Sequence, residues 1–206
     1  MEQFATEEQQ VEAIKRFWKE HGTAIIVGAV LGLGGLWGWR WYTDSQLEAQ
    51  EAASTQYQAT VEKLGQEGAN AELDAFIKAN SDSGYAGIAS LLAARQSVDD
   101  GDLDAAASHL NMVITNADDP QMKAIAGIRL ARVQLEMNQL DAALSTLNDI
   151  NDDAFTAQIA EVKGDVYVRQ NKMDDARMAY TSALEENANN PLLQMKLDNL
   201  AVAAGS

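Results

Sequence analysis

Three stretches of the chain follow one pattern, and this pattern decides the fold. They read "DDGDLDAAASHL" at 99–110, "EMNQLDAALSTL" at 136–147 and "RQNKMDDARMAY" at 169–180. Each contains a turn residue, a polar residue, Leu or Met, Asp, any residue and Ala, with a large apolar residue four positions after the alanine. The shared alanines, which recur at intervals of 37 and 33 residues, are Ala106, Ala143 and Ala176. A small side chain lets two helices cross closely, and the larger one a turn later fills the space beyond.

These intervals lie close to about 34 residues, the period of the tetratricopeptide repeat, which pairs two antiparallel helices. The third unit matches that repeat best, with signature positions filled by Gly164, Tyr167, Ala176, Tyr180 and Ala183. The sequence therefore predicts an all-α fold, in which a single N-terminal transmembrane helix precedes a tetratricopeptide-like superhelix of antiparallel helical hairpins. A generic stack of antiparallel helices is the alternative.

The rest of the body also reads as helix. After residue 42 no segment alternates with period two, and helix-forming residues dominate. We expect helices at 45–65, 70–80, 84–99, 103–116, 120–137, 140–149, 154–170, 173–187 and 191–203. The last of these would cap the open end that a repeat stack exposes.

The stretch "TAIIVGAVLGLGGLWGWRWY" at 23–42 predicts a membrane anchor. The 18 residues from Gly22 to Trp39 carry no charge and would span about 27 Å as a helix, close to the thickness of a bilayer's hydrocarbon core. Aromatic residues stand at both ends, as they do at membrane interfaces. A buried soluble helix would show a polar face, and a cleavable signal would need small residues where this chain has Trp and Tyr. We therefore expect a retained transmembrane helix at 22–42.

Flanking cations predict the orientation of this anchor. Lys15, Arg16 and Lys19 precede it, whereas Arg40 alone follows closely, and the positive side stays in the cytoplasm. The expected order is a cytosolic amphipathic tail at 1–21, the transmembrane helix at 22–42 and a tetratricopeptide-like domain at 43–206 on the outer side of the membrane, which is the periplasm if the cell is Gram-negative. The apolar face of the tail would lie on the inner leaflet or serve as a docking site for a cytosolic protein.

Small residues form ridges along the anchor, at Ala24, Gly28, Gly32, Gly34 and Gly38. Such ridges allow another membrane helix to approach closely, so these residues are candidates for helix packing. The alternative is that glycine is merely common in membrane helices.

Composition excludes several functions. The chain has a net charge of −16, and residues 43–206 hold eleven Lys and Arg against twenty-six Asp and Glu, a net charge of −15; such a surface repels nucleic acid. Cysteine is absent and the histidines number two, which leaves little for a catalytic triad or a zinc site. The acidic stretches that begin at Asp100 and Asp149 lack the glycine of a calcium loop, so we expect their acids to cap helices. We predict no catalytic, cofactor or metal site, and hence no enzyme.

Partners of the body would bind the first helix of each hairpin, which lines the concave surface of such stacks. The phase of the alanines places on this surface Ile88, Leu91, Arg95, Val98, Ile125, Ile128, Arg132, Leu135 and Arg169, together with Gln158, Glu161 and Asp165. Arg95 and Arg132 share one repeat position. They could hold a partner's carboxylate, or they could neutralise Asp99 and Glu136.

Three further stretches carry a resemblance across nearly the whole chain. "VEAIKRFWKEHG" at 11–22, "GWRWY" at 38–42 and "IRLARVQLEMNQLDAAL" at 128–144 resemble the YfgM family, the ancillary subunits of the SecYEG translocon. The resemblance implies a single-span inner-membrane protein that associates with SecYEG and with the membrane-anchored periplasmic chaperone PpiD, and that helps pass emerging proteins to other periplasmic chaperones. It also implies an alternative, a membrane-bound regulator of an envelope-stress response that acts through the cytosolic tail. An enzyme with an unrecognised site is the third alternative.

Overall fold

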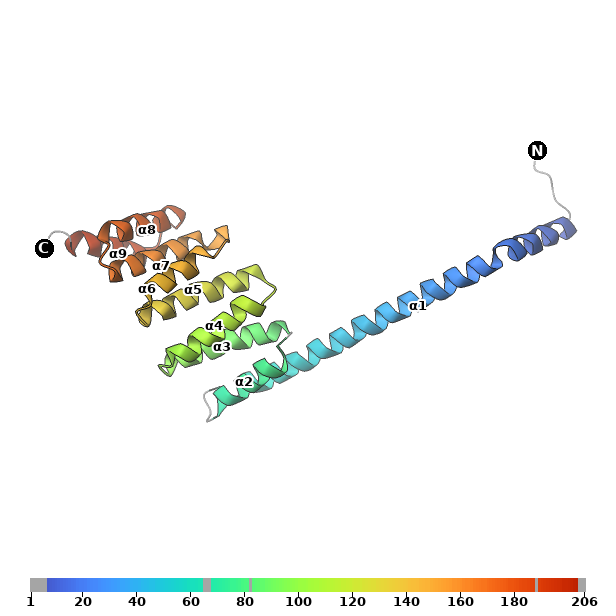
Figure 1. Ribbon diagram of the computed structural model, residues 1–206, viewed down its shortest axis with the longest axis horizontal. Helices are drawn as coiled ribbons and strands as arrows, with labels where there is room; N and C mark the ends of the chain where they lie inside the picture. The colour runs from blue at the N-terminus through green and yellow to red at the C-terminus, as the bar shows by residue number, and fades with distance from the viewer. Residues whose placement is uncertain (1–6, 65–67, 82, 188, 204–206) are drawn as a thin grey trace. The chain divides into compact units, whose positions relative to one another are not determined.

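The computed structural model describes residues 7–64, 68–81, 83–187 and 189–203, and in these residues the chain is helical without strands (Figure 1). The helices are α1 (Glu7–Val61), α2 (Ala69–Ala79), α3 (Gly84–Asp99), α4 (Leu103–Asn116), α5 (Pro120–Glu136), α6 (Leu140–Asn148), α7 (Thr156–Arg169), α8 (Met173–Glu186) and α9 (Pro191–Ala203), and a short 3₁₀ turn (Asp153–Phe155) precedes α7. The all-α prediction is confirmed. The first residues of the expected tail, 1–6, lie outside the described part.

The chain divides into two compact units, Met1–Ala52 and Ala53–Ser206. The helices expected at 22–42 and 45–65 join in α1, which ends at Val61 rather than at 65; residue 65 lies outside the described part. The residues between them continue the helix, and the Thr43 hydroxyl donates a hydrogen bond to the Trp39 carbonyl at 2.9 Å. Within the second unit, the end of α1 packs against α2 and α3 through Tyr57, whose ring lies 5.9 Å from Phe76 and 5.5 Å from Tyr85 between centroids. The helical stack thus starts with the end of α1.

The three aligned stretches form the same turn. Gly101, Asn138 and Asn171 each adopt a left-handed backbone, with φ of 79°, 60° and 59°. In the first turn, the Gly101 N–H donates to the Val98 carbonyl at 3.0 Å and the Asp102 N–H donates to the Ser97 carbonyl at 2.8 Å. This is the Schellman pattern that ends a helix, and the other two turns repeat it. Each turn therefore sends the following helix back along the preceding one.

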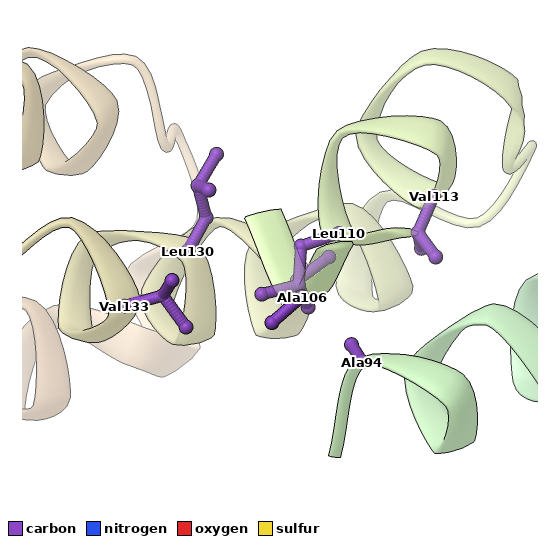
Figure 2. Packing of buried hydrophobic residues seen from close by; sticks show 7 residues of the cluster. Ala94, Ala106, Leu110, Val113, Leu130 and Val133 are labelled. Carbon is purple, nitrogen blue, oxygen red and sulfur yellow. The ribbon is translucent and has the colours of Figure 1, made fainter. Parts of the chain in front are cut away.

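The aligned alanines lie in the interfaces between paired helices. Ala106, Ala143 and Ala176 are all 0% exposed. The large apolar residues a turn later are buried as well: Leu110, Leu147 and Tyr180. Figure 2 shows one such cluster, in which α3 contributes Ala94, α4 contributes Ala106, Leu110 and Val113, and α5 contributes Leu130 and Val133. The alignment made from sequence therefore coincides with the buried contacts that hold the repeats together.

Helix starts use the acids that the sequence analysis assigned to capping. The carboxylates of Asp102, Asp119 and Asp152 accept hydrogen bonds from backbone N–H groups of the following turn at 2.9, 2.9 and 3.0 Å. Such a cap satisfies one of the free N–H groups at a helix start and adds about 1 kcal/mol. The capping prediction for the stretches that begin at Asp100 and Asp149 is confirmed.

Candidate functional site

The first helices of the hairpins form one layer. Helix α3 contacts α5, and α5 contacts α7, whereas no contact of this extent joins α4 to α6 or α6 to α8 within the described ranges. Helices that stand closer together lie on the inside of a curved stack. The inner layer, by which we mean α3, α5 and α7, is therefore the concave side on which partner residues were predicted.

A hollow of about 350 Å³ opens between α3 and α5. Two helical stripes face each other across it, since residues at i, i+3, i+4 and i+7 share one side of a helix. One stripe is Leu91, Ala94, Arg95 and Val98 of α3, and the other is Arg129, Arg132, Val133 and Glu136 of α5. Leu103 and Leu110 of α4 complete the lining. The hollow, called the α3–α5 hollow below, thus combines six apolar side chains with three arginines and one glutamate.

The arginines around the α3–α5 hollow differ in their partners. The Nε atom of Arg95 lies 3.8 Å from Asp99, with both side chains exposed. Glu136 lies 3.8 Å from Arg169 of α7 rather than beside Arg132. Arg129 and Arg132 are exposed, and neither makes an ion pair with any residue that the structure describes. The hollow therefore has two cations that no nearby acid neutralises.

The structure places the predicted partner residues in three settings. Leu91, Arg95, Val98 and Arg132 line the α3–α5 hollow. Ile88 is 41% exposed on α3, Ile125 is half-buried, and Arg169 contacts Glu136.

The prediction that Ile128 and Leu135 face a partner is wrong. They are 5% and 8% exposed and pack against Val162 and Val166 in the core. A partner cannot reach them on the folded domain.

Arg129 and Glu136 were missed by the sequence analysis. Both belong to the stripe of α5 that lines the α3–α5 hollow, three residues before and four residues after Arg132. Helical spacing from Arg132 could have identified them.

The C-terminal end of the inner layer carries a polar network. Lys196 of α9 donates to Glu161 at 2.7 Å and to Asp165 at 2.8 Å, and the Tyr180 hydroxyl donates to Asp165 at 2.7 Å. Burial raises the pKa of Tyr180, and the hydrogen bond to Asp165 raises it further. Burial acts to lower the pKa of Lys196, but the bonds to Asp165 and Glu161 outweigh it, so this pKa is raised. Glu161 and Asp165, predicted to face a partner, bind α9 instead.

Helix α1 contains the predicted anchor. It is the described helix that is long and apolar enough to cross a membrane, judged by length and composition. Its apolar side chains are exposed, for example Val30 at 65% and Leu31 at 70%. A Cβ atom added at Gly28, Gly32, Gly34 or Gly38 would meet no atom of the chain within 4 Å. The ridge of small residues is thus open along these glycines.

Comparison with known proteins gives matches along nearly the whole chain. A family model described as a tetratricopeptide repeat-like domain matches residues 15–202. A protein of Escherichia coli (strain K12) is 36% identical over 98% of this chain and 100% of its own length. One of Haemophilus influenzae is 35% identical, and one of Neisseria gonorrhoeae is 33% identical, each over 94% of this chain and 97% of its own length. All three are named ancillary SecYEG translocon subunit.

A solved structure shares the fold of about three quarters of this chain. It comes from a functional characterisation of Pseudomonas aeruginosa pilF, and it superposes with a TM-score of 0.57 over 76% of this chain and 71% of its own. The two sequences are 16% identical, so this likeness concerns the fold alone.

Proposed function

Because the chain belongs to the tetratricopeptide repeat-like family of ancillary SecYEG translocon subunits, we propose that it is a membrane-tethered, non-catalytic adaptor of the translocon. In this proposal it associates with SecYEG and helps pass translocated proteins to periplasmic chaperones. The observation that carries it is the match to the relatives over almost the full length of both chains. The exposed apolar stretch of α1 supports a membrane tether.

We propose the orientation from the charges that flank the anchor. Three cations precede the apolar stretch and Arg40 follows it, so the N-terminus would lie in the cytoplasm and the helical unit in the periplasm. The periplasmic chaperone PpiD and other periplasmic chaperones would then meet the inner layer of the stack. The glycine ridge of α1 would pack against a membrane helix of the translocon or of PpiD.

The test is a detergent pull-down of the full-length, affinity-tagged chain, with the subunits of SecYEG identified among the copurifying proteins. The proposal predicts that SecYEG copurifies, and its absence under mild detergent would contradict the proposal. The double variant Gly28→Ile with Gly32→Ile should still insert into the membrane, because both new side chains are apolar. It should copurify less SecYEG, because the added bulk at these open positions keeps a partner helix from approaching closely. Val30→Phe adds bulk to the opposite side of the helix and serves as the control.

Crosslinking distinguishes the adaptor from a regulator that acts through its tail. A photoreactive residue at Ile88, which is 41% exposed on the inner layer, should capture translocon or chaperone components, whereas one at Phe17 reports on the tail. Capture of a cytosolic regulator from Phe17 alone would favour the regulator.

A further inference from the structure

The α3–α5 hollow has a composition that suits a particular ligand. Its lining is apolar at six of ten positions, and its volume of about 350 Å³ lies near the lower end of the range for ligand pockets, about 300–1,000 Å³. A space of this size takes one or two apolar side chains. The hollow therefore calls for a small apolar group rather than for a long acyl chain.

The charges at the rim of the hollow determine which chemical group of a ligand can lie next to the bound apolar side chain. Four arginines (Arg95, Arg129, Arg132 and Arg169) lie in or next to the α3–α5 hollow, against the two acids Asp99 and Glu136. This local excess of positive charge lies in a segment, 43–206, whose net charge is −15. Guanidinium groups bind carboxylates through paired hydrogen bonds. The rim is thus complementary to an anion, and Arg129 and Arg132 are free to hold it.

We propose that the α3–α5 hollow binds a protein segment in which an apolar side chain stands next to a carboxylate, with the apolar side chain in the hollow and the carboxylate on Arg129 and Arg132. This inference rests on the proposed adaptor function and specifies the chemistry of the partner segment. A peptide fits better than a nucleic acid, which the acidic surface of the body repels.

Binding is measured with the full-length chain in detergent and a fluorescently labelled peptide, Gly-Leu-Leu-Asp-Glu-Gly. Two control peptides replace Asp-Glu by Asn-Gln and Leu-Leu by Gly-Gly. The proposal predicts that each replacement weakens binding at least about tenfold, a difference of about 1.4 kcal/mol. Equal binding of all three peptides, or equal binding of the first and the glycine peptide, would overturn it, since the latter result indicates charge attraction alone. These comparisons use the unaltered protein, so they do not depend on the folding of a variant.

Variants then locate the site. Arg129→Gln with Arg132→Gln should weaken binding of the first peptide about tenfold, and both side chains are exposed, so the helical content measured by circular dichroism should stay the same. The control is Arg177→Gln, which removes one positive charge from α8, outside the hollow, where Arg177 lies 3.6 Å from Asp174; it is compared with the single variants Arg129→Gln and Arg132→Gln, which also remove one charge each. Unchanged binding by the folded double variant would overturn the inference, and so would displacement of the peptide by phosphatidylglycerol added as mixed micelles in the same detergent, which would indicate a lipid ligand.

The inference and the proposed function fail separately. Copurification of SecYEG without peptide binding would remove the inference and leave the adaptor function in place. Peptide binding by a chain that does not copurify SecYEG would support the hollow as a binding site and contradict the translocon assignment.

Discussion

The contact between Gly164 and Tyr180 allows a sharp test of how the repeats pack. A methyl group added at Gly164 would overlap the Tyr180 ring at Cε1 and Cδ1 and would approach Cζ to 3.0 Å. Tyr180 is 3% exposed, and its hydroxyl is bound to Asp165 at 2.7 Å, so the ring cannot move aside freely. At the equivalent position the other two repeats have Ala94 and Ala131, which are paired with Leu110 and Leu147 in place of tyrosine. Glycine is thus matched to the larger partner and alanine to the smaller one.

The expected magnitudes follow from this matching. Overpacking a buried contact costs about 1–3 kcal/mol, and Gly→Ala within a helix gains about 1 kcal/mol, so Gly164→Ala should lower the unfolding free energy by about 1 kcal/mol. Tyr180→Leu should lower it by about 2–4 kcal/mol, because a ring and a hydrogen bond to a carboxylate are lost. In that background Gly164→Ala should raise stability by about 1–2 kcal/mol, since the methyl group fills the new space and the helix gains propensity. The same substitution would change sign between the two backgrounds.

The assay is thermal and urea unfolding of the full-length chain in detergent, followed by far-ultraviolet circular dichroism. For a unit of this size 1 kcal/mol corresponds to about 2–4 °C in Tm. Gly84→Ala is the control, because its Cβ would meet nothing within 4 Å; it should not reduce stability. If Gly164→Ala lowered stability equally with Tyr180 and with leucine at position 180, there would be no coupling, and the matching of sizes would be refuted.

Three further predictions concern the turns, the C-terminal network and the topology. Asn138→Ala should lower the urea midpoint by the equivalent of about 1 kcal/mol, because asparagine and glycine adopt the left-handed φ of 60° more readily than alanine does, whereas Asn138→Gly should not. Since the pKa of Lys196 is raised above 10.5 in the folded chain, its contribution is complete below about pH 10.5 and is lost as pH rises through the folded value. Unfolding free energy measured against pH should therefore fall more steeply above pH 10.5 in the parent chain than in Lys196→Met. A reporter enzyme that is active outside the cytoplasm should be active when fused after Ser206 and silent when fused near Glu20; the reverse result would contradict the proposed orientation.

The repeat units could be predicted because their signal is local. A left-handed turn residue, an aspartate and a small residue at fixed spacing lie within a dozen positions, and the chain shows this spacing three times. Ala106, Ala143 and Ala176 were identified on that basis, and all three are fully buried. The same local reasoning gave helix bounds close to those observed, since Pro120 and Pro191 mark helix starts and the left-handed residues mark helix ends.

The orientation of α5 could not be predicted in the same way. Helices α3, α4, α6 and α7 all contact α5, so its apolar residues do not form a single stripe with a polar side opposite. The sequence analysis transferred the helical positions of the aligned alanines to α5, and this placed Ile128 and Leu135 on the surface, although both lie in the core. The stripe that lines the α3–α5 hollow consists of Arg129, Arg132, Val133 and Glu136. Arg132 was therefore placed correctly, whereas Arg129 and Glu136 lie one residue after Ile128 and Leu135. A shift of one residue rotates a position by about 100°, which is enough to move it from the groove into the core.

The ion pairs between α9 and α7 could not be predicted from the sequence either. Lys196 meets Glu161 and Asp165 from 35 and 31 positions away, and no local spacing indicates that α9 returns to α7. The acids of α7 were therefore assigned to a partner, although the chain supplies their cation itself.

The surroundings of the individual arginines argue that the α3–α5 hollow is more than a place where acidic charge is offset. Arg40, Arg95 and Arg177 each lie near an acid three or four positions away on the same helix, at 3.9, 3.8 and 3.6 Å, the arrangement expected of surface cations that stabilise a helix. Arg129 has no acid three or four positions away in either direction. Arg132 has Glu136 four positions later, but that carboxylate pairs with Arg169. An exposed ion pair contributes about 0–1 kcal/mol, so leaving two arginines unpaired sacrifices little stability, while it leaves both guanidinium groups available for a carboxylate that the domain itself does not provide.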